Sequence, residues 1–170
     1  METGKTSIAL CGFMASGKSA LGRRLAAALG YDFVDTDELL LRRTGQTLPE
    51  MFAIGGEAYF RDREHETIRE AALLPRTVIA TGGGVMTFER NARLLAASTR
   101  IVHVHRSFDA CYASISRRKN RPIAGQKSRE ELLALYNARL DADARWADFN
   151  VENDGTPEEA VARVLAWLQG

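Results

Sequence analysis

Hydrophobic residues occur along the chain in two patterns, as short unbroken runs and as longer stretches with apolar positions three and four apart. The unbroken runs predict strands at residues 8–11, 33–34, 77–80 and 101–104, and a weaker pattern predicts a fifth strand at residues 150–151. The stretches with helical spacing predict helices over residues 20–29, 38–43, 47–54, 57–73, 92–97, 107–117 and 128–146, and a last one from residue 156. Strands that alternate with helices need crossover connections, so the pattern predicts an α/β fold with a parallel sheet covered on both faces.

Composition and charge exclude several classes of protein. The 170 residues are 45% hydrophobic and 26% charged, which is ordinary for a globular chain, and the length favours a single domain over residues 1–170. The formal net charge of +1 gives no indication of a nucleic-acid or membrane surface. No run approaches the roughly 20 apolar residues of a membrane span, and no signal-type hydrophobic region follows the first residues. We therefore expect a cytoplasmic protein without a nucleic-acid or membrane partner.

A phosphate-binding motif follows the first predicted strand. Residues 12–19, GFMASGKS, match the P-loop pattern G-x-x-x-x-G-K-[ST] without deviation. The glycines let the backbone wrap around phosphate oxygens, and the helix that begins here adds the positive end of its dipole. Lys18 can place its charge on the β- and γ-phosphates, and the Ser19 hydroxyl can bind Mg²⁺. A plain glycine-rich turn is the alternative, but the strand before the motif and the helix after it favour nucleotide binding.

Two carboxylates, Asp35 and Asp37, follow the second predicted strand, at the edge where open parallel sheets bind their ligands. One carboxylate can help to hold a metal ion, and the other can face the acceptor hydroxyl as a base. If the chain stays extended past Val34, both aspartates point to one side and Thr36 points to the other. The alternative is that Asp37 only caps the helix that starts at Glu38.

An arginine pairs with a buried acid in the helix predicted over residues 57–73. The inward stripe of this helix includes Glu64 among apolar residues, where an unpaired carboxylate is costly. Arg61, three positions earlier, is within reach of Glu64 and keeps spare donors for a ligand carboxylate. A solvent-exposed ion pair of Arg61 with Glu57 or Glu64 is the alternative.

Three successive glycines, Gly82, Gly83 and Gly84, end the third predicted strand. Glycines here allow a ligand to approach the backbone closely and leave N–H donors free. A tight turn would need the same residues, but a place beside the P-loop strand favours a ligand.

Two further arginines are candidates for anion binding. Arg139 follows the apolar face of its helix, with no acid nearby in the sequence, so it points inward to an anionic ligand or to a distant structural partner. Arg121 lies in the basic stretch RKNRPIAGQK, a loop that can close over ATP and bring an arginine to the transferring phosphoryl group. A solvated loop whose charges do nothing is the alternative.

We interpret the remaining polar candidates as structural. Cys11 is expected to be a small buried residue. His103 and His105 are expected to face opposite sides of the sheet, and no metal-ligand spacing accompanies them.

Together these motifs resemble those of the shikimate kinases, small P-loop kinases of the nucleoside-monophosphate-kinase fold group. The resemblance runs from residue 12 to about residue 148 and rests on GFMASGKS, FVDTD, TGQTLPEMFAIGGEAYFRDREHE, ATGGGV, NRPI and the late Arg139. It implies a three-layer α/β/α fold with a central five-stranded parallel sheet. It further implies a single P-loop kinase domain with a substrate-binding helical segment over about residues 38–72 and a mobile lid over about residues 117–128.

The resemblance also implies an activity, namely ATP-dependent phosphorylation of the 3-hydroxyl of shikimate, which gives shikimate 3-phosphate and ADP on the pathway to chorismate and the aromatic amino acids. Catalysis would involve Lys18, Asp37 and Arg121. The cofactor would be Mg²⁺, held by Ser19 directly and by Asp35 through water. We expect a monomer. The residues that would bind ATP are Ala15, Ser16, Gly17, Lys18, Ser19, Ala20 and Arg121, and those that would bind shikimate are Asp37, Arg61, Gly82, Gly83, Gly84 and Arg139.

The chain departs from the family pattern at three places. Ser114 and Ile115 stand where many members carry an arginine followed by Thr or Ile that stacks on adenine, so Arg117 or Arg118 would have to replace that arginine. The usual Arg-Pro-Leu-Leu is RPIA at residues 121–124, and the usual Pro-Leu-Tyr after the late arginine is DAD at residues 141–143.

Other functions compete with this interpretation. A P-loop kinase for another small polyol acid, such as gluconate, quinate or aminoshikimate, would share the fold but differ in the acceptor site. An inactive nucleotide-binding regulator is expected to lack Lys18, Ser19 or one of the aspartates, and all of them are present. The near-neutral charge and the lack of a stripe of aromatic and basic residues argue against a nucleic-acid-binding module.

Overall fold

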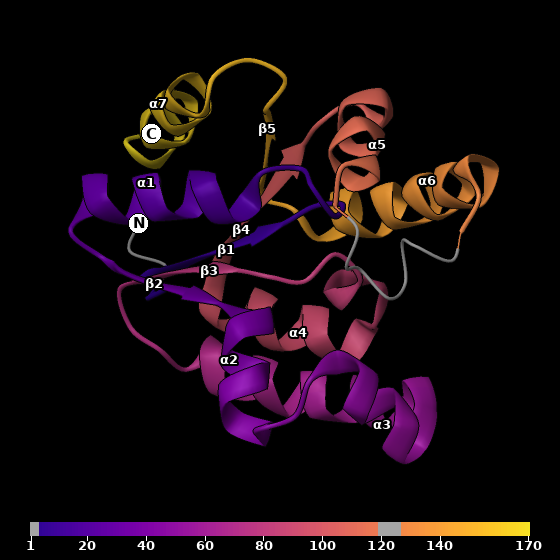
Figure 1. Cartoon of the computed structure of the whole chain (residues 1–170). Coiled ribbons are helices and arrows are strands. Elements are labelled where there is room, and N and C mark those ends of the chain that lie inside the picture. Colours follow the sequence, from indigo (N-terminus) through magenta and orange to yellow (C-terminus); the bar gives the residue numbers. More distant parts are fainter. Residues whose placement is uncertain (1–3, 119–126) are drawn as a thin grey trace.

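A parallel sheet of five strands forms the centre of the chain (Figure 1). The structure is a computed structural model that describes residues 4–118 and 127–170. The strands lie in the order β2-β3-β1-β4-β5, and every neighbouring pair is parallel. The predicted α/β fold is confirmed, with strands at β1 (Ser7–Cys11), β2 (Asp32–Asp35), β3 (Thr77–Ala80), β4 (Thr99–His105) and β5 (Phe149–Glu152).

The helices fall where the apolar spacing predicts them, with differences at their ends. They are α1 (Lys18–Leu29), α2 (Thr36–Thr44), α3 (Leu48–Ala72), the short 3₁₀ helix η1 (Val85–Thr87), α4 (Glu89–Ser98), α5 (Phe108–Ser116), α6 (Arg129–Trp146) and α7 (Pro157–Leu168). Two helices expected over residues 47–54 and 57–73 join into α3, with a kink at Gly55 and Gly56, whose backbone angles are not helical. In the part of the chain that the structure describes, no helix combines the length and the apolar character needed to cross a membrane.

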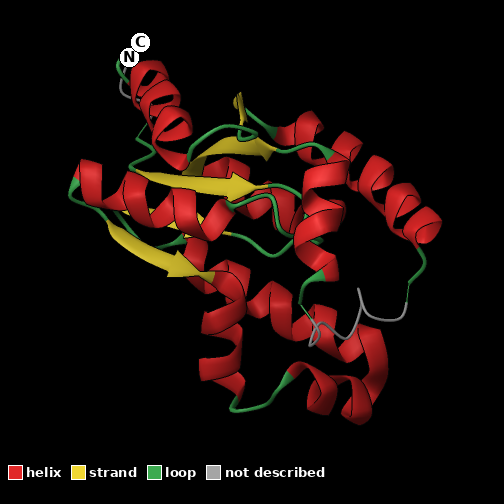
Figure 2. Cartoon of the chain, turned by 45° about the horizontal axis from the view of Figure 1, so that its top comes forward, coloured by secondary structure: helices red, strands yellow, loops and turns green. Residues whose placement is uncertain are grey.

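Helices cover both faces of the sheet because side chains along each strand alternate between the faces. On β1, Ile8 and Leu10 pack in one apolar cluster with α1 and α7. Ala9 and Cys11 point the other way, into a cluster with α3, α4 and η1. Figure 2 shows the sheet between these two layers of helices.

The segment over α2 and α3 projects beyond the sheet (Figures 1 and 2). It has a small apolar cluster of its own, in which Leu40 of α2 packs with Met51 and Phe60 of α3. A third cluster joins Phe13 of the P-loop to α5 and α6. These packed elements surround the carboxyl ends of the strands, which is where open parallel sheets place their ligands.

Part of one predicted segment lies outside the described residues. The lid expected over about residues 117–128 includes residues 119–126, and Arg121 is among them.

Candidate active site

A cleft of ≈ 210 Å³ lies at the carboxyl ends of β1, β2 and β3. It brings together side chains or backbone from the P-loop, from the two aspartates after β2 and from the glycines after β3. The residues that line it are Met14, Ala15, Gly17, Lys18, Ser19, Ala20, Asp35, Asp37, Thr81, Gly82, Gly83 and Arg118. Three motifs that are far apart in the sequence thus meet in one concave site.

The P-loop wraps closely because two of its positions admit only glycine. At Gly12, with φ 152°, a side-chain carbon would lie 2.5 Å from the carbonyl oxygen of Val104 on β4. At Gly17, with φ 91°, such a carbon would lie 2.5 Å from Nδ2 of Asn153. Helix α1 begins at the next residue, Lys18, two positions before its predicted start. The free N–H groups of its first turn therefore lie against the loop, which favours phosphate binding.

Lys18 is held inside the loop. Its residue is only 8% exposed, and its Nζ donates hydrogen bonds to the carbonyl oxygens of Gly12 (2.6 Å) and Phe13 (2.9 Å). Burial lowers the pKa of Lys18, while the carboxylates of Asp143 and Asp37 act in the opposite direction. The ammonium group is therefore positioned at the loop before any phosphate arrives.

Two residues that sequence reasoning missed brace the P-loop from outside. Arg106 donates from Nη1 to the carbonyl oxygen of Ala15 (2.8 Å), and Asn153 donates from Nδ2 to that of Ser16 (2.8 Å). Each follows directly after a strand, β4 or β5, at the same edge of the sheet as the motif. Their position directly after a strand could have identified them in the sequence, because polar residues at the carboxyl ends of parallel strands gather at one site.

Asp35 accepts three hydrogen bonds, and two of them correct an expectation. Its Oδ2 accepts a hydrogen bond from the Ser19 hydroxyl (2.6 Å), while its Oδ1 accepts from the backbone N–H groups of Asp37 (2.9 Å) and Glu38 (3.3 Å). Asp35, not Asp37, therefore caps the following helix, α2. The chain stays extended only through Asp35, because α2 begins at Thr36, so the expected alternation of side chains up to Asp37 is wrong.

The Ser19 and Asp35 pair fits a magnesium ion. The hydroxyl and the carboxylate converge within 2.6 Å at the wall of the cleft, beside the P-loop. Mg²⁺ prefers oxygen ligands and commonly binds through one or two protein groups together with substrate phosphates.

The glycines after β3 make room for charged side chains. A side-chain carbon at Gly82 would lie 2.8 Å from Oδ1 of Asp37, and one at Gly84 would lie 3.0 Å from Nη2 of Arg61. The expectation that all three N–H groups stay free is wrong for Gly82, which donates to the Thr36 hydroxyl (3.2 Å). The glycines therefore allow protein side chains to approach the backbone closely, and the approach of a ligand stays a prediction.

Arg61 and Glu64 form the predicted buried pair. Nη1 of Arg61 lies 2.9 Å from Oε1 of Glu64, and their side chains are 10% and 5% exposed. Burial raises the pKa of Glu64, and the charge and hydrogen bond of Arg61 oppose that rise. The solvent-exposed alternative for this pair is wrong. Glu57, by contrast, is exposed and lies 3.5 Å from Nε of Arg61.

Arg139 points inward, as predicted, and reaches the same glycines. A side-chain carbon at Gly84 would lie 3.1 Å from Nη2 of Arg139, close to the atoms of Arg61. Burial lowers the pKa of Arg139, and the positive charge of Arg61 adds to this effect. The expectation that no acid stands nearby in the sequence is wrong, because Asp143 lies one helical turn later and opposes the lowering. Two buried guanidinium groups at one glycine make a site suited to an anion.

The two histidines of β4 share one face of the sheet, contrary to expectation. Side chains two positions apart in a strand point the same way, and the ring centroids of His103 and His105 are 5.9 Å apart. His103 pairs with Asn150 of β5 (Nδ1 to Oδ1, 2.9 Å), and His105 pairs with Glu152 (Nδ1 to Oε2, 2.7 Å). Cys11 is buried, as predicted.

A loop with the P-loop sequence lies beside a polar cleft and beside a hydroxyl and a carboxylate that could hold a metal ion, on a parallel α/β sheet. These are the features of a P-loop kinase. Comparison with known proteins gives the family. A family model described as shikimate kinase matches residues 14–169. The chain belongs to the shikimate kinase family, and the resemblance noted in the sequence is confirmed.

Individual relatives agree with this assignment. The chain is 34% identical to a shikimate kinase of Xanthomonas oryzae pv. oryzae over 164 residues, which is 95% of this chain and 91% of the relative. It is 36% identical to a shikimate kinase of Deinococcus radiodurans over 166 residues, covering 94% and 84% of the two chains. A structure of shikimate kinase from Acinetobacter baumannii in complex with shikimate superposes with a TM-score of 0.91 at 31% identity, over 97% of this chain and 93% of the other. The enzyme from Aquifex aeolicus superposes with a TM-score of 0.84 at 31% identity, over 96% of each chain.

Proposed function

We propose that this enzyme transfers the γ-phosphoryl group of ATP to the 3-hydroxyl of shikimate, and that the residues of the cleft divide this work between nucleotide and acceptor. One observation carries the proposal. The P-loop lysine and the two buried arginines lie around the same pair of glycines. Gly83 lines the cleft together with Lys18, and its neighbour Gly84 lies next to the guanidinium groups of both Arg61 and Arg139.

On the nucleotide side, the backbone N–H groups of residues 15–20 bind the phosphates of ATP, and Lys18 stabilises the charge that develops between the β- and γ-phosphates. The two carbonyl contacts of Lys18 support this role, because they hold the ammonium group at the loop. Ser19 and, through water, Asp35 hold Mg²⁺, which neutralises phosphate charge when it is bound. Arg106 and Asn153 keep the loop in shape by binding its carbonyl groups.

On the acceptor side, Arg61 and Arg139 bind the carboxylate of shikimate, while Gly82, Gly83 and Gly84 let its ring approach the backbone. The burial of both arginines supports this, since a desolvated guanidinium group binds a carboxylate more strongly than an exposed one. Asp37 lies at the wall of the cleft between the P-loop and Gly82, where it can accept the proton of the attacking hydroxyl.

The role of Arg121, the monomeric state and the location rest on the sequence alone, whereas a role for Arg118 has support from the cleft. Arg121 would reach the ATP phosphates from a lid over about residues 117–128. The enzyme would act as a monomer in the cytoplasm. Arg118 lines the cleft beside the P-loop, which supports a nucleotide contact for it in place of the family's arginine at residue 114.

The identity of the acceptor is tested by measuring ADP release with ATP and Mg²⁺ against shikimate, quinate, aminoshikimate and gluconate in parallel. We expect shikimate to give the highest kcat/KM. A higher kcat/KM with another acid would keep the kinase assignment but overturn shikimate as the acceptor. No ADP release with any of the four acids would overturn the proposed reaction.

A further inference from the structure

A buried amide side chain, that of Asn91 in the first turn of α4, has no part in the proposed reaction. The residue is 1% exposed, and its side chain lies between α3 and η1. Its Nδ2 donates a hydrogen bond to the carbonyl oxygen of Val85 (3.1 Å), and its Oδ1 lies 2.7 Å from Nδ1 of His65. A buried amide is costly unless its polar atoms are hydrogen-bonded, and here both ends of the amide have a partner. Asn91 therefore joins two segments of the chain that are otherwise separate.

The two hydrogen bonds of Asn91 have fixed directions. The carbonyl oxygen of Val85 can only accept, so the NH₂ group of Asn91 faces it and the side-chain oxygen faces His65. That oxygen can also only accept, so the network assigns a hydrogen to Nδ1 of His65. His65 thus donates to Asn91, and Asn91 donates to Val85. A side chain at position 91 that cannot both accept and donate would break this chain of hydrogen bonds.

Each end of the chain of hydrogen bonds lies next to a residue of the proposed acceptor site. His65 is one helical turn after Arg61 on α3, and Val85 directly follows Gly84. Arg61 and Gly84 are close to each other, since a side-chain carbon at Gly84 would lie 3.0 Å from Nη2 of Arg61. Asn91 therefore ties the helix that carries the guanidinium group to the turn that this group approaches.

The residue before Asn91 holds α3 at the same place, but from the surface. Nη2 of Arg90 donates to the carbonyl oxygen of Arg61 (3.2 Å) and to Oδ1 of Asp62 (3.0 Å). The side chains of Arg90 and Asp62 are 45% and 57% exposed, so water weakens this contact. The buried hydrogen bonds of Asn91 are therefore the stronger constraint on how α3 and α4 pack.

An aromatic ring of the same segment also contacts the guanidinium group. The carbon at the centre of the Arg61 guanidinium lies 5.0 Å from the centre of the Phe88 ring, within the range of a cation–π contact. The backbone N–H of Asn91 donates to the carbonyl oxygen of Phe88 (3.0 Å). The segment from Gly84 to Phe88 therefore meets the guanidinium group at two points, and Asn91 is hydrogen-bonded to this segment through both its side chain and its backbone.

We propose that Asn91 is a positioning residue of the acceptor site, which sets the place of the Arg61 guanidinium group relative to Gly84 through its hydrogen bonds to His65 and Val85. The proposal rests on the proposed function for the identity of the acceptor. A carboxylate bound by Arg61 must also fit against the glycines, so a change in this relationship affects the acceptor and spares ATP. Because Asn91 is buried, it acts through Arg61 and Gly84 and does not itself bind the acceptor.

Steady-state kinetics of Asn91→Ala test this role. We expect KM for shikimate to rise by about 10- to 100-fold, because a misplacement of about 1 Å can cost up to about 100-fold, while KM for ATP changes little. An unchanged KM for shikimate, or an equal rise in both KM values, overturns the proposal.

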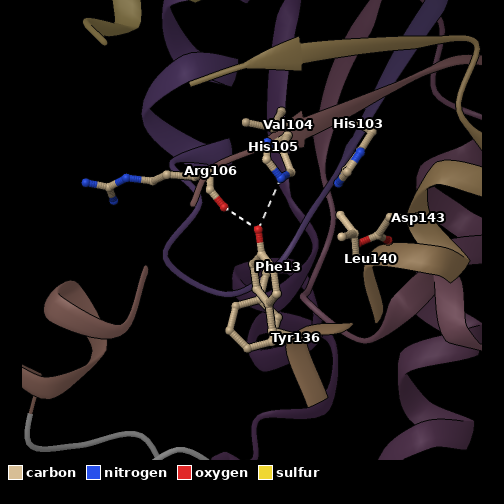
Figure 3. A pocket seen from close by; sticks show the side chains of 8 residues that line it. All are labelled: Phe13, His103, Val104, His105, Arg106, Tyr136, Leu140 and Asp143. Atoms are coloured by element: carbon tan, nitrogen blue, oxygen red, sulfur yellow. Dashed lines mark hydrogen bonds between the residues drawn. The ribbon is translucent and has the colours of Figure 1, made fainter. Parts of the chain in front are cut away.

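Asn150→Ala is the matched control, because Asn150 of β5 pairs with His103 through the same atoms (Oδ1 to Nδ1, 2.9 Å). Figure 3 shows His103 at a small pocket that is lined by residues of the P-loop, β4 and α6. Loss of this second pair removes a hydrogen bond of the same kind at another place in the fold. Asn150→Ala should leave KM for shikimate unchanged, and a rise equal to that of Asn91→Ala would overturn the proposal.

Variants of His65 keep the proposal testable if Asn91→Ala does not fold. His65 is only partly buried, so its substitution is less disruptive. His65→Asn keeps an N–H donor near the position of Nδ1, whereas His65→Leu has no donor. We expect His65→Leu to raise KM for shikimate by about 10-fold, the low end of the range, because the hydrogen bond from Asn91 to Val85 remains. His65→Asn should stay close to the unmodified enzyme, and equal KM values in the two variants would contradict the proposal.

Amide hydrogen exchange of the ligand-free enzyme separates this proposal from the identity of the acceptor. Residues 84–88 should exchange faster in Asn91→Ala than in the unmodified enzyme, and Asn150→Ala should not show this change. If shikimate is not accepted but exchange responds in this way, the proposed function fails and the positioning by Asn91 stands. The kinetic comparison then uses the acid with the highest kcat/KM of the four. Unchanged exchange of residues 84–88 in both Asn91→Ala and His65→Leu overturns the proposal, whatever the acceptor is.

Discussion

The guanidinium groups of Arg61 and Arg139 meet over the backbone of Gly84, where a side-chain carbon would lie 3.0 Å from Nη2 of Arg61 and 3.1 Å from Nη2 of Arg139. Two like charges in this position repel each other, and both residues are buried. Acids on the same helices oppose this repulsion: Glu64 forms an ion pair with Arg61, and the charge of Asp143 acts to raise the pKa of Arg139. The arrangement leaves a concentrated positive potential at one glycine, which an anionic substrate group can use.

Gly84→Ala should impair the acceptor and spare the nucleotide. The backbone angles of Gly84 (φ −108°, ψ 3°) are open to alanine, so the new methyl group acts only through the two arginines it would displace. We expect KM for shikimate to rise by about 10- to 100-fold, since a shift of about 1 Å in a binding group can cost this much. Steady-state kinetics that vary each substrate in turn check this prediction, with KM for ATP as the internal control. An equal rise in both KM values would contradict it.

Arg61→Lys should likewise raise KM for shikimate far more than KM for ATP. Lysine keeps the charge but lacks the planar pair of donors that fits a carboxylate, and it leaves the buried Glu64 with a weaker partner. Thermal unfolding should therefore occur at a lower temperature as well. The matched control is Arg63→Lys, because Arg63 pairs with Glu66 at the same spacing (2.9 Å) but in a more exposed position. If the two variants behave alike, Arg61 does not bind the acceptor.

Lys18→Met should leave the fold intact and remove most of the phosphoryl transfer. The methionine side chain suits a buried position, but it supplies no charge to the β- and γ-phosphates. Loss of such an electrostatic contact is expected to lower kcat by about 10²- to 10³-fold. The comparison variant is Lys5→Met, which changes a lysine that precedes β1 at the opposite edge of the sheet. A near-normal kcat in Lys18→Met, at an unchanged unfolding temperature, would rule out the proposed role of this lysine.

Asp35→Asn and Asp37→Asn should separate the metal from the acceptor. Asparagine caps a helix about as well as aspartate, so Asp35→Asn retains the cap of α2 and weakens mainly the site it forms with Ser19. The Mg²⁺ concentration for half-maximal activity should rise, while shikimate still binds. Asp37→Asn cannot accept the hydroxyl proton and should lower kcat by about 10²- to 10⁴-fold, or less if the loose transition state needs little help from a base. Magnesium titrations and shikimate binding on both variants decide between these roles, and matching profiles would mean that the roles are shared.

The stability of the protein should depend on pH through Asp143. Its pKa is raised by folding, from 3.8 to about 7, so the folded state binds this proton more tightly than the unfolded state does. The contribution is fully present below about pH 4 and is lost as the pH rises through about 7. The urea midpoint of the unmodified protein should therefore fall relative to that of Asp143→Asn between these pH values. Asp141→Asn should follow the unmodified protein, and parallel curves for all three would contradict the prediction.

Local patterns were sufficient for much of this fold. The central strands β1 and β3 were visible as apolar runs, because a parallel strand between two neighbours is buried on both faces. The edge strands β2 and β5 gave weaker patterns, since they are short and carry polar, exposed residues. The P-loop was recognisable because phosphate binding needs particular residue types within eight consecutive positions. The pair of Arg61 and Glu64 was predictable for a similar reason, since residues three apart in a helix are neighbours whatever the rest of the chain does.

One error depends on the exact point where an element begins, and another on the two-residue repeat of a strand. The sequence offered Asp37 as the helix cap, but Asp35 is the cap, because α2 begins at Thr36, two residues before its predicted start. The histidines of β4 were placed on opposite faces, although a strand repeats every two residues.

By itself, the sequence determined the sheet, the helices, the nucleotide motif and the inward direction of Arg61 and Arg139, because each of these follows from spacing along one element. Only the tertiary structure decided that both arginines meet at Gly84, that Arg106 and Asn153 brace the P-loop, and that Ser19 bonds to Asp35. These contacts join residues from different strands and helices. The distances between such residues are set by how the layers pack, and no pattern within a single segment records them.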